Sequence, residues 1–67
     1  MNKFAQRLRE LLKGNDISKT NFAKALGISI SSVSDYCSGK REPSFDILIL
    51  ICKELNEKAD YLLGLED

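Results

Sequence analysis

Residues 17–44 of the chain read ISKTNFAKALGISISSVSDYCSGKREPS. One short pattern occurs twice here: an apolar residue, a serine, an apolar residue four positions after that serine, and later a glycine. The serine hydroxyl can accept a free backbone N–H of a first helical turn, and the two apolar residues can pack across it. The glycine suits the left-handed conformation that ends many helices. The first copy holds Ile17, Ser18, Phe22 and Gly27, and the second holds Ile28, Ser29, Val33 and Gly39.

This repeat predicts two short helices joined by a tight turn at residues 26–29, which is the form of a helix–turn–helix over about residues 18–38. Three further helices are expected around it. Apolar residues at helical spacing, interrupted by charges, predict a helix from Phe4 to the polar stretch 14–16. Ser44 is expected to cap a fourth helix that runs to Leu55, and a short fifth helix covers about residues 59–63.

The apolar run 47–51 could also form a buried strand, but no second strand is available to pair with it. Polar residues 53–54 continue the pattern at helical spacing instead. The expected fold class is therefore all-α, with five helices in a single helix–turn–helix domain over residues 1–67.

Composition excludes several classes of function. The chain has 67 residues, two cysteines and no histidine, which rules out histidine-based metal sites, histidine acid–base catalysis and Ser–His triads. We expect no enzyme activity, no metal or other cofactor and no small-molecule substrate. The longest apolar run, residues 47–52, is far shorter than the ~20 residues needed to cross a bilayer. We therefore expect no membrane contact, a cytoplasmic location, and reduced thiols at Cys37 and Cys52.

Charge is divided unevenly along the chain, although ten basic and ten acidic residues cancel overall. Residues 1–41 hold eight basic and three acidic side chains, a net charge of +5, whereas residues 42–67 hold two basic and seven acidic ones, a net charge of −5. Such asymmetry can indicate a basic surface that meets a polyanion. It can equally be an ordinary solvated surface, and the count alone leaves both interpretations open.

Four segments in this order resemble the lambda-repressor-like (Cro/repressor, XRE-type) helix-turn-helix family: residues 17–29, 33–36, 38–44 and 60–64. Each segment alone is a loose match, but together they are specific, and they extend the resemblance from about Phe4 to Leu65. The resemblance implies five helices, sequence-specific binding to double-stranded operator DNA, and a homodimer. The main alternative is a protein–protein interaction module on the same fold, such as an antitoxin or antirepressor, with little DNA readout.

By position, the resemblance makes residues 29–38 the recognition helix, whose exposed N-terminal half would enter the major groove. The residues at base-contact positions are Ile30, Ser31, Ser34 and Asp35. Ile30 could touch only an apolar edge such as a thymine methyl, and serine discriminates poorly between bases. Asp35 could accept from a cytosine amino group, or it could simply face solvent. This helix has no Arg, Gln or Asn for a bidentate base contact.

Phosphate contacts are expected from basic residues and from helix N-termini next to this helix. Lys19 stands where the family commonly has glutamine, and Lys40 and Arg41 follow the recognition helix, although a plain solvated loop is the alternative there. Arg7, Arg9, Lys13 and Lys24 are expected to be ordinary surface charges. The full set of predicted phosphate contacts is Ser18, Lys19, Ser29, Ser38, Lys40, Arg41 and Ser44.

Two departures from the family pattern carry further expectations. Many members bury an arginine against a glutamate where this chain has Leu12 and Cys37, so an apolar core contact is expected to replace the ion pair. The fourth and fifth helices also hold more apolar residues than one core face needs, which suggests a two-fold dimer interface. The alternative is that some of these side chains are merely exposed. The predicted interface residues are Ile47, Leu50, Tyr61, Leu62 and Leu65.

Overall fold

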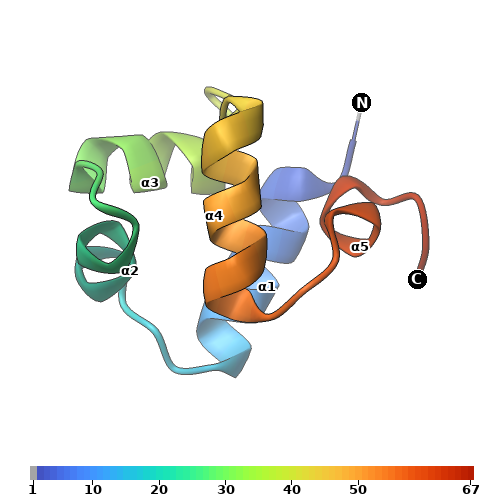
Figure 1. Ribbon diagram of the computed structural model, residues 1–67, viewed down its shortest axis with the longest axis horizontal. Coiled ribbons are helices and arrows are strands. Elements are labelled where there is room, and N and C mark those ends of the chain that lie inside the picture. The colour runs from blue at the N-terminus through green and yellow to red at the C-terminus, as the bar shows by residue number, and fades with distance from the viewer. Residues whose placement is uncertain (1) are drawn as a thin grey trace.

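The computed structural model describes residues 2–67, which form five α-helices and no strand. These are α1 (Phe4–Gly14), α2 (Lys19–Leu26), α3 (Ile30–Ser38), α4 (Phe45–Leu55) and α5 (Ala59–Leu63). Helix α1 packs against α3 and α5, while α2 packs against α3 and α4 (Figure 1). The predicted all-α fold with five helices is confirmed. Among residues 2–67, no helix is long and apolar enough to span a membrane.

The helix ends follow the predicted serine and glycine signals. Each capping serine accepts, through Oγ, the backbone N–H three residues further along, as expected for an N-cap. The donor–acceptor distances are 3.1 Å for Asn21 to Ser18, 3.1 Å for Ser32 to Ser29 and 3.2 Å for Ile47 to Ser44. Gly27 and Gly39 end α2 and α3 with φ angles of 71° and 80°, a left-handed conformation that costs glycine little. The turn between α2 and α3 is therefore specified locally.

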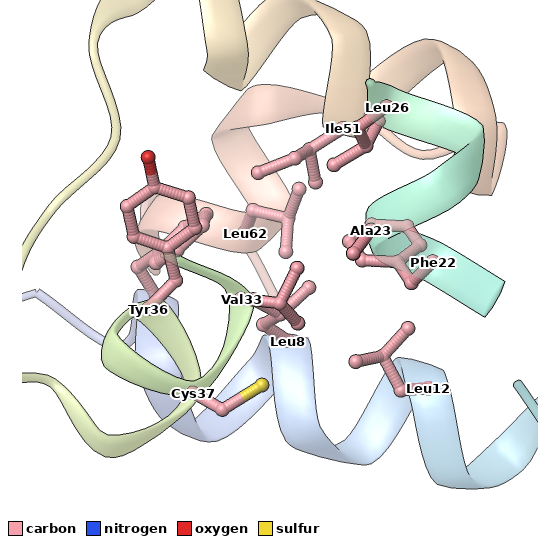
Figure 2. Packing of buried hydrophobic residues seen from close by; sticks show 11 residues of the cluster. Leu8, Leu12, Phe22, Ala23, Leu26, Val33, Tyr36, Cys37, Ile51 and Leu62 are labelled. Carbon is pink, nitrogen blue, oxygen red and sulfur yellow. The ribbon is translucent and has the colours of Figure 1, made fainter. Parts of the chain in front are cut away.

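All five helices contribute to one apolar core (Figure 2). Its fully buried residues include Leu8 of α1, Phe22 of α2, Val33 of α3 and Ile51 of α4. The α5 residue Leu62, which was predicted to lie at a dimer interface, has no exposed surface and belongs to this core. That prediction is wrong because α5 docks its buried side on α1 and α4.

Two positions that often hold a buried ion pair in the family are apolar core positions in this protein. Leu12 and Cys37 are both buried in the same cluster, as expected from the loss of both charges together. Figure 2 shows the Cys37 sulfur directed toward the cluster. No unpartnered charge is left at this point of the core, which avoids the desolvation cost of a lone ion.

Arg7 is not the surface charge that was predicted. It is only 8% exposed, its guanidinium lies 4.3 Å from the centre of the Tyr61 ring, and Nη1 donates to the Tyr61 carbonyl at 2.6 Å and to the Glu66 carbonyl. The cause is its position on α1: Arg7 is three residues after Phe4 and four before Leu11, so it lies on the face that meets α5. Arg7 thereby ties α1 to the segment that follows α5.

Arg9 was also predicted to be an ordinary surface charge, and the structure gives it a structural contact. Its Nη1 donates to the carbonyl of Cys37, in the last turn of α3. The last carbonyls of a helix lack intrahelical partners, and a cation near them is favoured by the helix dipole. Arg9 therefore links α1 to the C-terminal end of α3.

Replacing Arg7 by methionine should destabilise the fold while keeping much of the apolar stem. The Arg7→Met variant leaves the Tyr61 and Glu66 carbonyls without their charged donor, and such hydrogen bonds contribute about 2 kcal/mol. We expect a loss of that size in the free energy of unfolding, measured by urea denaturation. Gln6→Met, on an exposed position of the same helix, should change it by less than about 0.5 kcal/mol. Equal unfolding midpoints for the two variants would refute the role given to Arg7.

Candidate nucleic-acid interface

Helix α3 runs along one edge of the molecule, next to α2 (Figure 1). Its inner face is buried through Val33, Tyr36 and Cys37. This leaves the opposite face of α3 exposed, and the turn at Gly27 sets its angle to α2. A short helix held rigidly at the surface by a preceding helix is the arrangement that helix–turn–helix proteins insert into a DNA groove.

The residues predicted to contact bases are spread over the first two turns of α3. Ile30 is 48% exposed and Ser31 is exposed, whereas Ser34 and Asp35 are half-buried. Of these four residues, the two in the first turn are therefore the most exposed, and the first turn is the part that the motif places deepest in a major groove. Ile30 and Ser31 offer an apolar side chain and a hydroxyl there.

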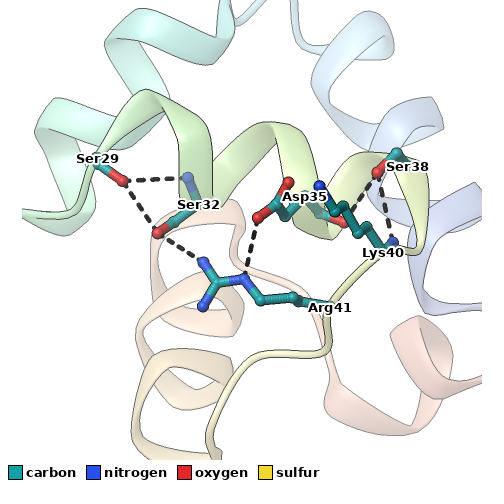
Figure 3. A network of polar contacts seen from close by, with 6 residues as sticks. All are labelled: Ser29, Ser32, Asp35, Ser38, Lys40 and Arg41. Carbon is teal, nitrogen blue, oxygen red and sulfur yellow. Dashed lines mark hydrogen bonds and ion pairs between the residues drawn. The ribbon is translucent and has the colours of Figure 1, made fainter.

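Asp35 does not point freely into solvent, contrary to one of the two expectations for it. Its Oδ2 lies 3.0 Å from Nε of Arg41, which returns to α3 from the loop after it (Figure 3). The same guanidinium donates from Nη2 to Ser32 Oγ at 2.9 Å and lies 5.5 Å from the centre of the Tyr36 ring. Ser32 Oγ also accepts from Ser29 Oγ at 3.0 Å. Hydrogen bonds thus join the N-cap of α3 to Asp35.

Sequence reasoning missed Ser32 and the fold-back of Arg41. The available signal was the opposite charge of Asp35 and Arg41, six residues apart across the helix-ending Gly39. A glycine in the left-handed conformation reverses the chain direction at a helix end, so a side chain just after it can reach the preceding turns. The backbone N–H groups of Lys40 and Arg41 both donate to the Asp35 carbonyl, at 3.0 and 3.3 Å, which fixes this return.

All seven residues predicted to contact phosphate are exposed. The hydroxyls of Ser18, Ser29 and Ser44 are already engaged as helix caps. Ser38 Oγ is likewise engaged, because it donates to the Asp35 carbonyl at 3.2 Å. These serines therefore mark the places where backbone N–H groups of helix N-termini or loops meet solvent. The exposed ammonium groups of Lys19 and Lys40 supply the positive charge.

Both cysteine thiols have a raised pKa. Burial raises the pKa of the Cys37 thiol, while the nearby charges of Lys19 and Arg9 act in the opposite direction. Burial is the larger effect, so Cys37 stays a protonated thiol at neutral pH and is poorly suited to redox chemistry. Burial and the charge of Glu57 raise the pKa of Cys52 as well.

The remaining residues of the predicted dimer interface differ in exposure. Leu50 and Leu65 are exposed, whereas Ile47 is half-buried against the core and Tyr61 is half-buried beneath the Arg7 guanidinium. Sequence reasoning did not single out Phe45 and Ile49, which are also exposed. They lie four residues apart on α4 and so share one face of it.

Comparison with known proteins agrees with this geometry. The fold and the exposed α3 define a five-helix helix–turn–helix domain, and the model of the family described as helix-turn-helix matches residues 8–62. The chain belongs to this family, and the resemblance stated from the sequence is confirmed.

Individual relatives carry similar descriptions. The chain is 33% identical over 64 residues to the uncharacterized HTH-type transcriptional regulator YobD of Bacillus subtilis, covering 96% of this chain and 57% of YobD. It is 35% identical over 60 residues to the uncharacterized HTH-type transcriptional regulator YqaE of the same organism, covering 90% of this chain and 52% of YqaE. A crystal structure of a transcriptional regulator from Listeria innocua superposes with a TM-score of 0.91 and 25% identity, over 100% of this chain and 63% of that one. The chain thus spans about half the length of these curated relatives.

Proposed function

We propose that this chain is a sequence-specific DNA-binding transcriptional regulator. The observation that carries the proposal is α3 itself, a surface helix that follows a capped turn, with an exposed lysine in the helix before it, Lys19, and another in the loop after it, Lys40. Support also comes from the relatives, which are described as transcriptional regulators. This function needs no catalytic chemistry, because the protein would act by occupying DNA. A regulator of this kind would work in the cytoplasm, where the DNA lies.

In the proposed complex, the first turn of α3 enters the major groove. Ile30 contacts a thymine methyl, and Ser31 and Ser34 form hydrogen bonds to base edges. Lys19 and Lys40 contact phosphates on either side of the groove. The N-termini of α2, α3 and α4 direct backbone N–H groups toward phosphates of the DNA. Net charge does not oppose this arrangement, since the acidic excess belongs to residues 42–67.

We further propose that the protein is a repressor that binds a palindromic operator as a homodimer. A second copy would bury exposed apolar side chains of α4 and of the segment after α5, among them Leu50 and Leu65. Two-fold symmetry of such a dimer would be mirrored in the operator, with half-sites about 34 Å apart on one face of the duplex. Occupancy of that site would exclude RNA polymerase.

Selection from a pool of random duplexes tests the proposal, with bound sequences read out by sequencing at low salt. We expect an enriched inverted repeat whose half-site centres are one helical turn apart. The rival function, a protein–protein interaction module, predicts no enrichment of any sequence. Enrichment of a single half-site without a repeat would support DNA binding but contradict the proposed homodimer.

A further inference from the structure

We propose that Arg41, supplied by the loop after α3, reads a guanine base in the bound DNA, and that Asp35 positions it. The inference rests on the proposed function, DNA binding through α3. Helix α3 itself lacks strong base readers: in its first two turns, the exposed Ile30 and Ser31 and the half-buried Ser34 have no planar pair of donors. Arg41 folds back onto α3 and brings such a group to it (Figure 3).

The contacts of Arg41 hold the guanidinium and leave part of it available. Nε donates to Asp35 Oδ2 at 3.0 Å, and Nη2 donates to Ser32 Oγ at 2.9 Å. A guanidinium has five N–H donors, and within residues 2–67 Nη1 has no hydrogen-bond partner. The side chain is 53% exposed. The edge formed by Nη1 and Nη2 can therefore donate to O6 and N7 of guanine, the commonest specific contact in the major groove.

Asp35 is better placed to orient Arg41 than to read a base itself. Its carboxylate is already paired at 3.0 Å with the guanidinium, and its side chain is only 28% exposed. The centre of the Tyr36 ring lies 5.5 Å from Cζ of the same guanidinium, an arrangement that stabilises the cation. Two anchors and one ring restrict the rotamers of Arg41, so less side-chain freedom is lost when a base is bound. The ion pair also offsets the negative charge that would repel phosphate.

Lys40 provides the internal contrast. It is adjacent in sequence and exposed, and within residues 2–67 its ammonium group forms no ion pair or hydrogen bond. A lysine ammonium is a flexible point charge without the fork geometry of arginine. Lys40 is therefore assigned to phosphate and Arg41 to a base, although both follow α3 directly.

The test repeats the random-duplex selection with the wild-type protein and with Arg41→Lys, Asp35→Ala, Asp35→Asn and Lys40→Ala. Far-UV circular dichroism first establishes that each variant is folded. Arg41→Lys keeps the charge but loses the fork, so we expect a preference for guanine at one position of each half-site to fall about tenfold or more. The salt dependence of its affinity should stay unchanged, since the charge is kept.

The Asp35 variants distinguish a positioning role from a purely structural one, because loss of a purely structural residue would not change the base preference at one position. Asp35→Ala should weaken the guanine preference at that same position while affinity for unrelated duplexes stays equal or rises, because a negative charge is removed. Asp35→Asn keeps an acceptor oxygen for Nε and should retain more of the preference. Lys40→Ala, the matched control, should weaken binding to all sequences alike and leave the preference intact.

Three results would overturn the inference. Unchanged base preferences in Arg41→Lys would make Arg41 a phosphate contact only. A cytosine preference lost in Asp35→Ala but kept in Arg41→Lys would mean that Asp35 reads a base directly. The absence of any enriched sequence with the wild-type protein would contradict the proposed function as well. The first two results, in contrast, would contradict only the roles given to Arg41 and Asp35.

Discussion

Truncating Phe22 to alanine should remove a large part of the free energy of unfolding of the protein. Phe22 is 1% exposed and is the largest of the fully buried side chains. Replacing a buried phenylalanine by alanine costs about 3–5 kcal/mol. A domain of this size has a total stability of roughly 3–10 kcal/mol, at about 0.05–0.15 kcal/mol per residue. The loss is therefore about a third or more of the whole stability, and thermal unfolding followed by circular dichroism would measure the lowered midpoint.

The chain contains its own control for this experiment. Phe45 opens α4 and is 85% exposed, so Phe45→Ala removes the same atoms from a site that buries few of them. We expect its unfolding midpoint to remain close to that of the wild-type protein. Similar losses of stability in Phe22→Ala and Phe45→Ala would contradict the assignment of the core.

Removing Lys19 and Lys40 together should strongly reduce the salt dependence of DNA binding. Each phosphate contact contributes about 0.9 to the slope of the logarithm of affinity against the logarithm of salt concentration. Two lysines in each subunit of the proposed dimer give a change of about 3.6. Between about 50 and 200 mM salt, the wild-type protein should therefore lose about 150-fold more affinity than Lys19→Ala/Lys40→Ala. Filter binding or fluorescence anisotropy over this range measures it.

Lys53→Ala serves as the matched control, because Lys53 lies in the last turn of α4, at the end that points away from α3 (Figure 1). Its salt slope should equal that of the wild-type protein. The proposal that Lys19 and Lys40 contact phosphate would be abandoned if the double variant and Lys53→Ala gave the same slope.

The helices were predictable from the sequence because their signals are local. Ser18, Ser29 and Ser44 bond to backbone groups three residues away, and Gly27 and Gly39 act on the turn in which they sit. Such contacts depend on chain geometry alone. The fold class and the position of α3 follow from them.

The errors lie where contacts join distant residues. Arg7 and Tyr61 are 54 positions apart, and no local sequence pattern predicts that the Arg7 guanidinium will stack on the Tyr61 ring. Leu62 belongs to a helix of five residues, which is too short for periodicity to define a buried face. Its burial depends on how α5 docks on α1 and α4.

The candidate site was partly predictable for the same reason. The exposed first turn of α3 follows from the repeated capping pattern, so the positions of Ile30 and Ser31 could be foreseen. The place of Arg41 could not, because it depends on the path of the loop after Gly39 and on the partners Asp35 and Ser32. Those contacts make Asp35 one half of an ion pair and not a lone acidic side chain.

We propose that α3 and the loop after it form the surface that binds DNA. Amide chemical-shift mapping of the ¹⁵N-labelled protein, titrated with the enriched duplex, would locate this surface. We predict that the largest shifts fall within residues 29–41, with a smaller group at the start of α2 near Lys19. Shifts centred instead on the exposed apolar residues Ile49 and Leu65, or no shifts at equimolar duplex, would contradict the account.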